Sequence, residues 1–311
     1  MPELNAFSQT GSVSEILSAL RALQTRDDYV ESEVKRTGGI ATKWWLGCGG
    51  SALLAFLCIF LVGAIAVVGV PLLIIAVIAG IVCLVFGIKW SSLCGKWRAQ
   101  DLDDRRMALG VRFLEVLGQD IPNKAKCTLA INFDGYLKHG KLVAEQRGRE
   151  IYPIRLAKYE DFWFSATGRL HDGNRFRLSV EQVVNRKEKR KPKYTKVLER
   201  TADKVTLVMR IAPEGYPNWQ QLAQTLQPGM ADGLQIMRAD VRDGIVRLVG
   251  LTPLCERRSG RGEQVGGEEN LATGDTLLKL FLYAYDKLQY CRPQAPGQGG
   301  AAPAPEAPPA Q

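Results

Sequence analysis

The chain has 311 residues, of which 46% are apolar and 23% charged, and its net charge is +9. This length accommodates about two domains. The averages conceal a block without any charged side chain, which runs between Lys43 and Lys89 and contains Ser51 as its only hydroxyl. Such a block excludes a purely soluble enzyme and a collagen-like chain, and its length excludes a transporter with six or more spans.

Residues for metal or covalent chemistry are few. The seven cysteines form no Cys-x-x-Cys pair, and their odd number fits a reducing compartment better than a disulfide framework. Without paired cysteines, His139 and His171 do not make a zinc site. The segment 135–141 begins like a phosphate-binding loop, but Leu142 stands where that motif requires Ser or Thr. We therefore expect no cofactor, no metal and no catalytic activity.

Residues 1–43 are expected to form a cytoplasmic amphipathic helix. Ser12 and Glu15 have the spacing of a capping box, which predicts the start of the helix, and the pair Gly38–Gly39 predicts its end. The apolar stripe of this helix favours docking on the protein's own core. An oligomerising coil is the alternative.

The uncharged block predicts a transmembrane helical hairpin within residues 44–97. An uninterrupted helix over the whole block would be roughly 68 Å long, more than twice the ~30 Å of the hydrocarbon core. The chain must therefore turn, and Pro71 favours a turn at residues 68–71, because the residue before a proline resists helical geometry. The resulting helices cover about 45–67 and 71–90.

The flanks of the hairpin predict its orientation. Lys and Arg residues precede and follow the hairpin, whereas the turn is uncharged. The positive-inside rule then puts both termini and the main domain in the cytoplasm, at the inner (cytoplasmic) membrane. Because the turn has no polar side chain for the far headgroups, a hairpin wedged into one leaflet is the alternative.

Small residues recur at multiples of four along both predicted helices, which allows backbones to approach closely. They pack the two helices of one hairpin together, or they mediate self-association into a homo-oligomer. These transmembrane packing residues are Gly47, Ser51, Ala55 and Gly63 in the first helix, and Ala76 and Gly80 in the second.

The chain after the hairpin begins with a membrane-proximal helix in residues 98–122 and continues as a β-rich cytosolic domain in residues 123–292. Apolar and polar residues alternate there, which predicts half-buried antiparallel strands. One strand puts Phe162 and Phe164 on the side opposite to Trp163. The fold class is thus an α+β membrane protein whose cytosolic domain is mostly antiparallel β, sandwich or barrel-like, with flanking helices.

Turn residues place two hairpins in this domain. Asp172–Asn174 predicts one turn, and a two-residue turn at Asp243–Gly244 sets Asp240 opposite Arg247. Further expectations are a short helix near 219–226, a final helix of about 275–290, a mobile loop at 256–269 and a disordered Pro/Ala tail at 293–311.

The strongest polar feature is the basic run Arg186–Arg200, which lies between two strand patterns and is expected to form a long hairpin tip. It is either a solvated tip or a contact for an anionic partner. A second cluster, of three arginines, is brought onto one outward sheet face by the Asp172–Asn174 turn. The candidate anion- or ligand-binding residues are Arg169, Arg175, Arg177, Arg186, Lys187, Lys189, Arg190, Lys191 and Lys193.

In layout alone, the chain is similar to bacterial two-transmembrane effectors, in which a cytosolic β-rich domain senses a ligand and the membrane part acts. This similarity carries no residue over. We expect a membrane-anchored binding or effector protein that self-associates and perturbs the membrane. Its expected partners are membrane lipid and an anionic small ligand, nucleic acid or protein. The alternatives are a non-catalytic membrane adaptor or scaffold, and a membrane-bound enzyme.

Overall fold

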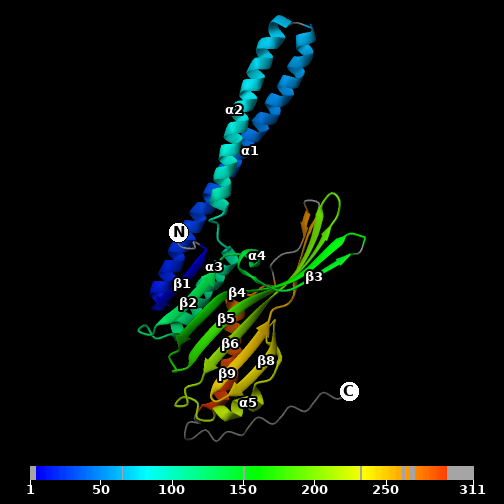
Figure 1. Cartoon of the computed structure of the whole chain (residues 1–311). Coiled ribbons are helices and arrows are strands. Elements are labelled where there is room, and N and C mark those ends of the chain that lie inside the picture. The colour runs from blue at the N-terminus through cyan, green and yellow to red at the C-terminus, as the bar shows by residue number, and fades with distance from the viewer. Residues whose placement is uncertain are drawn as a thin grey trace, which may run out of the picture. The chain divides into compact units, whose positions relative to one another are not determined.

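The chain combines a helical N-terminal region, two long apolar helices and one large antiparallel sheet, and is therefore an α+β protein (Figure 1). This computed structural model describes residues 5–64, 66–149, 151–231, 233–260, 263–265 and 270–292. The expected tail at 293–311 lies outside the described residues, as do the side-chain surroundings of Gly63. Two compact units form, one built mainly from Ser14–Val111 and the other mainly from residues 112–130 and 136 onward.

The helices are α1 (Val13–Ala64), α2 (Ala66–Arg98), α3 (Asp104–Leu117), α4 (Tyr136–His139), α5 (Leu222–Thr225) and α6 (Gly274–Leu288). The strands are β1 (Ala6–Gly11), β2 (Cys127–Asn132), β3 (Lys141–Arg149), β4 (Pro153–Arg169), β5 (Arg175–Arg190), β6 (Thr195–Arg210), β7 (Gly229–Ala231), β8 (Leu234–Arg242), β9 (Ile245–Leu251), β10 (Cys255–Gly260) and β11 (Glu263–Val265).

Helices α1 and α2 lie side by side as an antiparallel pair (Figure 1). The Trp44 ring stacks on Phe86 with centroids 4.8 Å apart. Trp45 Nε1 donates a hydrogen bond of 3.0 Å to Ser91 Oγ. Two segments, Val13–Ile59 and Val70–Arg98, are long and apolar enough to cross a membrane.

The expected ends of these helices are wrong in two places. Helix α1 continues through Gly38–Gly39, because a glycine inside a helix costs only about 1 kcal/mol. The break between α1 and α2 falls after Ala64, so Pro71 lies inside α2 rather than at the turn. A proline removes one helical hydrogen bond, and so near a helix start it need not end the helix.

The strands run in the order β1-β2-β4-β5-β6-β9-β8-β7, while β3 pairs with β4 and β10 with β6 and β11. The described strands thus form one open sheet rather than the expected sandwich or barrel. The reason is that helices, instead of a second sheet, cover its apolar face. The rings of Phe113 in α3 and Phe281 in α6 both meet Phe176 of β5, with centroids 6.4 and 5.3 Å away.

The β8–β9 hairpin has the predicted register, with Asp240 opposite Arg247. Asp243 and Gly244 adopt φ values of 51° and 72°, the left-handed pair that a two-residue hairpin turn needs. In β4 the predicted alternation fails at a bulge between Phe162 and Phe164. The extra residue buries Trp163 together with Phe164 and leaves Phe162 49% exposed.

Three other expectations concern the end of the chain. The short helix near 219–226 and the final helix are confirmed as α5, with the 3-10 turn before it, and α6. The loop expected at 256–269 instead supplies β10 and β11, because Cys255–Ser259 pairs with β6, where Arg200 Nε lies 3.1 Å from Glu256 Oε2. Residues 261–262 and 266–269 lie outside the described part of the chain.

Candidate anion-binding face and ligand pocket

The β5–β6 hairpin carries most of the predicted site residues. Its register runs without a shift from Arg175 opposite Arg210 to Arg190 opposite Thr195. Even-numbered residues of β5 near its start are buried under the helices, so the odd-numbered residues face outward along the strand. At about 3.3 Å per residue, the sixteen paired positions give an outward face roughly 50 Å long.

An arginine row crosses three strands at one end of this face. Arg169 of β4 is opposite Arg175 of β5, and Arg175 is in turn opposite Arg210 of β6. Neighbouring strands are about 4.8 Å apart, so the row spans about 10 Å. Arg177 follows two residues along the same face of β5. The expectation that Arg169, Arg175 and Arg177 share one outward face therefore matches the register, and Arg210 is an addition that the sequence analysis missed.

The arginine row (Arg169, Arg175, Arg210) has no carboxylate partner within the described residues. Its three members line a hollow of about 280 Å³ together with Gly173 and Ala212. Like charges directly opposite each other on a sheet are destabilising. Among the described residues, the row thus gathers three like charges without a carboxylate to offset their repulsion.

The middle of the outward face is electrically neutral by comparison. Lys204 Nζ lies 2.9 Å from Glu181 Oε2, and Lys158 Nζ lies 2.8 Å from Glu160 Oε1. The ion-paired part of the outward face therefore lies between the arginine row and the basic run.

The basic run Arg186–Arg200 is not one tip. Strand β5 extends to Arg190 and β6 begins at Thr195, so only residues 191–194 form the turn. The strand alternation then divides the basic residues between two faces. The expectation of a single tip is wrong because both strands extend further into the basic run than their apolar alternation indicates.

Arg186 lies on the inner of these two faces and is fully engaged. Its guanidinium is 2.7 Å from Glu188 and 2.8 Å from Glu199, and it donates a hydrogen bond of 2.9 Å to Tyr136 Oη. Burial, and then the hydrogen bond to Glu199, raise the pKa of Tyr136 well above its usual value. This network makes Arg186 a structural residue rather than a free anion contact.

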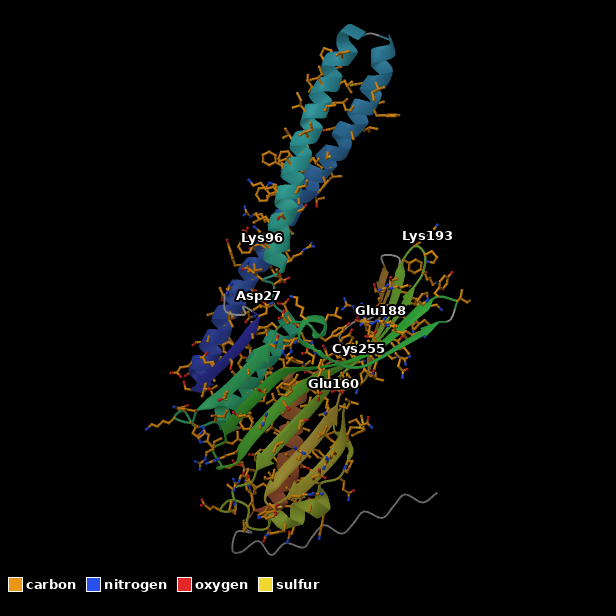
Figure 2. All side chains as sticks on the ribbon, viewed as in Figure 1. Asp27, Lys96, Glu160, Glu188, Lys193 and Cys255 are labelled. Carbon is orange, nitrogen blue, oxygen red and sulfur yellow. The ribbon has the colours of Figure 1, made fainter. Side chains whose placement is uncertain are left out.

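Lysines of the run lie on the outward face of β5 and at the turn, where Figure 2 labels Lys193. Lys187 and Lys193 are exposed. Lys189 Nζ lies 6.0 Å from the Tyr152 ring centroid, and Lys191 Nζ lies 5.2 Å from that of Tyr194. Arg190 is exposed at the end of β5.

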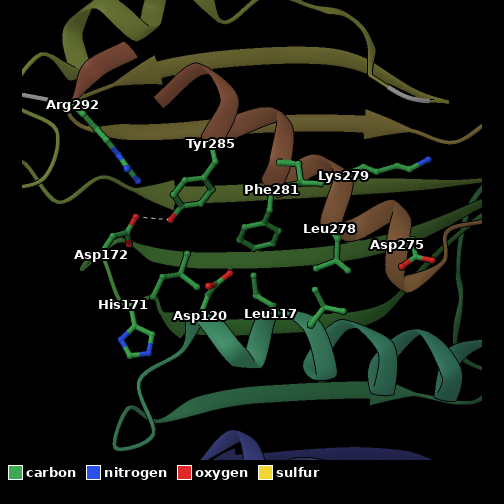
Figure 3. Close-up of a pocket in the computed structure, with 13 residues that line it drawn as sticks. Leu117, Asp120, His171, Asp172, Asp275, Leu278, Lys279, Phe281, Tyr285 and Arg292 are labelled. Carbon is green, nitrogen blue, oxygen red and sulfur yellow. Dashed lines mark hydrogen bonds between the residues drawn. The ribbon is translucent and has the colours of Figure 1, made fainter. Parts of the chain in front are cut away.

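A pocket of about 570 Å³ lies between the end of α3 and α6 (Figure 3). Leu117, Leu170 and Phe281 form a buried apolar floor. Asp120 and His171 stand at its polar end, and neither side chain has a hydrogen-bond partner within the described residues. No motif in the sequence indicates this pocket, because its walls come from three distant segments.

Asp172 fixes the polar end of the pocket to α6. Its Oδ2 accepts hydrogen bonds of 2.8 Å from Tyr285 Oη, 2.9 Å from Tyr216 Oη and 2.7 Å from Asn174 Nδ2. Burial raises the pKa of Tyr285 far above its ordinary value, so the hydroxyl stays a donor. The same turn carries Arg169 and Arg175 on its flanks, so one network supports both the pocket and the arginine row.

One acid–base pair occurs elsewhere on the sheet. His139 Nδ1 lies 2.7 Å from Asp161 Oδ1, and Asp161 is fully buried. Such a pair orients an imidazole as catalytic bases are oriented. In the described residues, no hydrogen bond joins His139 to a serine, threonine or cysteine that would serve as a nucleophile. Nor do His, Cys, Asp and Glu residues there group as a metal site.

The small residues of the helical hairpin mark where α1 and α2 approach each other. An added Cβ at Gly47 would lie 3.1 Å from Cys83 Sγ, and one at Gly80 would lie 3.6 Å from Ser51 Cβ. Ala76 is buried and Ala55 half-buried. Within one chain, α1 and α2 therefore already pack against each other at these residues, whether or not a second copy also contacts them.

Comparison of the chain with known protein families, with curated proteins and with solved structures finds no match.

Proposed function

We propose that the chain is a membrane-anchored binding protein whose sheet domain captures an anionic ligand at the arginine row. The α1–α2 hairpin enters the inner (cytoplasmic) membrane, with both termini and the sheet domain in the cytoplasm. The support for the anchor is the uncharged block flanked by Lys and Arg, and the exposure of side chains such as Leu53 and Ile75 on the helix surfaces.

The observation that carries the binding function is the arginine row itself. Three guanidinium groups in register, without a carboxylate, offer up to fifteen N–H donors to a multivalent anion, at five per arginine. The planar guanidinium group of arginine can donate two parallel hydrogen bonds to a phosphate or a carboxylate. Such charge-assisted hydrogen bonds are about twice as strong as neutral ones. A phosphate-bearing ligand would also relieve the repulsion among the three side chains.

Tripolyphosphate is a suitable probe for the full chain in phosphatidylcholine nanodiscs. It should bind and raise the unfolding temperature, and Arg175→Gln with Arg210→Gln should weaken binding about tenfold or more. Arg190→Gln with Lys193→Gln removes the same charge from the far end of β5–β6 and should leave the affinity within about twofold. The opposite pattern would transfer the site to the basic run, and equal small losses would reduce the arginines to solvated charge.

The consequence of binding separates an effector from an adaptor. In the effector form of the proposal, copies of the hairpin self-associate and disturb the bilayer once the ligand is bound. Dye leakage from vesicles that contain the full chain should then increase on addition of tripolyphosphate. Unchanged leakage with intact binding would favour a non-catalytic adaptor or scaffold. Anion-dependent turnover that requires His139 would favour the third alternative, a membrane-bound enzyme.

The pocket between α3 and α6 supports a second candidate, recognition of a small amphipathic ligand. A volume of about 570 Å³ with an apolar floor and a polar end is typical of ligand sites. Leu282, at the mouth, is 68% exposed, and Leu254, on another part of the domain, is 62% exposed. Binding of fluorinated fragments to the full chain should be abolished by Leu282→Trp and retained in Leu254→Trp. Loss with both substitutions, or with neither, would refute the pocket.

A further inference from the structure

The β3–β4 and β5–β6 hairpins end together at a surface that is at once apolar, aromatic and basic. Ile151, between β3 and β4, is 88% exposed, which exceeds every other large apolar side chain of the described residues. Tyr152 follows it and lies beneath Lys189 of β5, so the two turns are neighbours. Leu156 of β4, which lies opposite Lys187 of β5, is 42% exposed. We call this region the distal end, which consists of Ile151, Tyr152 and residues 187–194.

The distal end has an excess of positive charge. Lys187, Lys193 and Arg190 are exposed, whereas Glu188 is held 2.7 Å from Arg186 on the other face. No carboxylate of the described distal residues is therefore left to neutralise the lysines at the turn. A solvated tip would need neither an 88% exposed isoleucine nor tyrosines packed under its lysines.

We propose that the distal end docks on the anionic headgroup surface of the bilayer that holds α1 and α2. Lysines at an anionic surface gain electrostatic free energy, tyrosines favour the headgroup region, and an exposed aliphatic side chain inserts among the acyl chains. The tether raises the effective concentration of lipid near the domain, so a weak contact is well populated.

The geometry favours lipid over nucleic acid. Single-stranded nucleic acid is held by bases that stack on exposed aromatic faces. Tyr152 and Tyr194 are instead half-buried, and lysine ammonium groups lie 6.0 and 5.2 Å from their ring centroids. A polyanion offers no apolar contact to the exposed Ile151 side chain, whereas the acyl chains of a bilayer do.

This inference rests on the membrane anchor of the proposed function and not on the arginine row. Docking would give the sheet domain a second contact with the membrane, independent of whether the row is occupied. The arginine row belongs to the opposite end of β5–β6, so ligand binding and docking involve different residues.

Amide hydrogen exchange of the full chain in nanodiscs tests the contact. Peptides that cover the distal end should exchange about tenfold more slowly in phosphatidylcholine with phosphatidylglycerol than in phosphatidylcholine alone. The β8–β9 turn at Asp243–Gly244 is an internal reference, because it is another exposed hairpin turn flanked by arginines and should exchange alike in both lipids. Protection of the distal end should weaken steeply between about 50 and 300 mM salt.

Two variants separate the charge from the apolar contribution. Lys189→Gln with Lys191→Gln and Lys193→Gln should abolish the lipid-dependent protection, and Ile151→Ser should reduce it several-fold. The matched control, Arg238→Gln with Arg242→Gln and Arg247→Gln, removes three charges around the β8–β9 turn and should leave the protection intact.

Several outcomes would overturn the proposal. These are equal exchange of the distal end in both lipids, equal protection of the β8–β9 turn, or protection that survives the lysine substitutions. Protection by an oligonucleotide in neutral nanodiscs, without protection by anionic lipid, would make the distal end a nucleic-acid site. Fast exchange in peptides of α2 would instead refute the anchor, and the two failures are therefore distinguishable in one experiment.

Discussion

Replacing Asn174 by alanine tests the network that joins the β4–β5 turn to the rest of the sheet domain. Asn174 is fully buried, and its Oδ1 accepts a hydrogen bond of 2.7 Å from the Ala212 amide. Its Nδ2 donates bonds of 2.7 Å to Asp172 and 3.1 Å to Tyr285. The substitution therefore leaves a backbone donor without its partner and removes one donor from a carboxylate.

The expected cost follows from these losses. An orphaned buried donor costs about 1–3 kcal/mol, and a hydrogen bond to a charged group contributes about 1.5–3 kcal/mol. Tyr216 and Tyr285 continue to solvate Asp172, so the total should be roughly 2–4 kcal/mol rather than the full sum. For a domain of this size, the unfolding temperature should fall by roughly 5–15 °C.

Thermal unfolding of the full chain in neutral nanodiscs measures this shift. Asn185→Ala is the control, since Asn185 is an exposed asparagine on the same strand and should change stability by less than about 0.5 kcal/mol. The variant should also bind tripolyphosphate less tightly, because the turn that carries Arg169 and Arg175 loses its support. If Asn174→Ala unfolds within about 2 °C of Asn185→Ala, the network does not stabilise the domain as argued.

Three further predictions concern other parts of the chain. Gly250→Ala should destabilise the domain by about 1–3 kcal/mol in the same melting assay, since its Cβ would lie 2.5 Å from Leu234 Cδ2, whereas Gly229→Ala meets open space and should be neutral. Burial raises the pKa of Cys127 to about 11, so iodoacetamide at about pH 8 should label it only after unfolding, and mass spectrometry of the folded protein should show it unmodified. Reporter fusions before the first residue and after Arg292 should report the same side of the membrane, and opposite readings would contradict the hairpin.

Local signals predicted the parts of the fold that depend on a few neighbouring residues. The β8–β9 register followed from Asp243–Gly244, because a two-residue turn fixes every pair behind it. The bulge in β4 was not predictable in this way. Trp163 and Phe164 are both aromatic, so the sequence contains no polar residue to show where the alternation shifts.

The candidate site was predicted in part for a related reason. Arg175 and Arg177 share a face by alternation alone, and the turn at Asp172–Asn174 brings Arg169 beside them. Arg210, 35 residues after Arg175 in the sequence, joins the row only through the register of β5–β6, which the turn at residues 191–194 sets. Because the whole basic run was taken as a tip, that register could not be derived. The pocket was missed because its floor combines α3, the turn after β4 and α6.

The pairing of β1 with β2 constrains the membrane topology independently of charge. β1 precedes the α1–α2 hairpin and β2 follows it, yet they are neighbours in one sheet, with Thr10 Oγ1 and Thr128 Oγ1 2.9 Å apart. An open sheet does not exist in the hydrocarbon core, because its edge groups would lack partners. Both strands must therefore lie on the same side of any bilayer that the hairpin enters. The flanking Lys and Arg then have only to select which side that is. Since β1 cannot meet β2 until the hairpin has returned, completion of the sheet edge depends on formation of the hairpin, and a fragment that begins after α2 lacks β1.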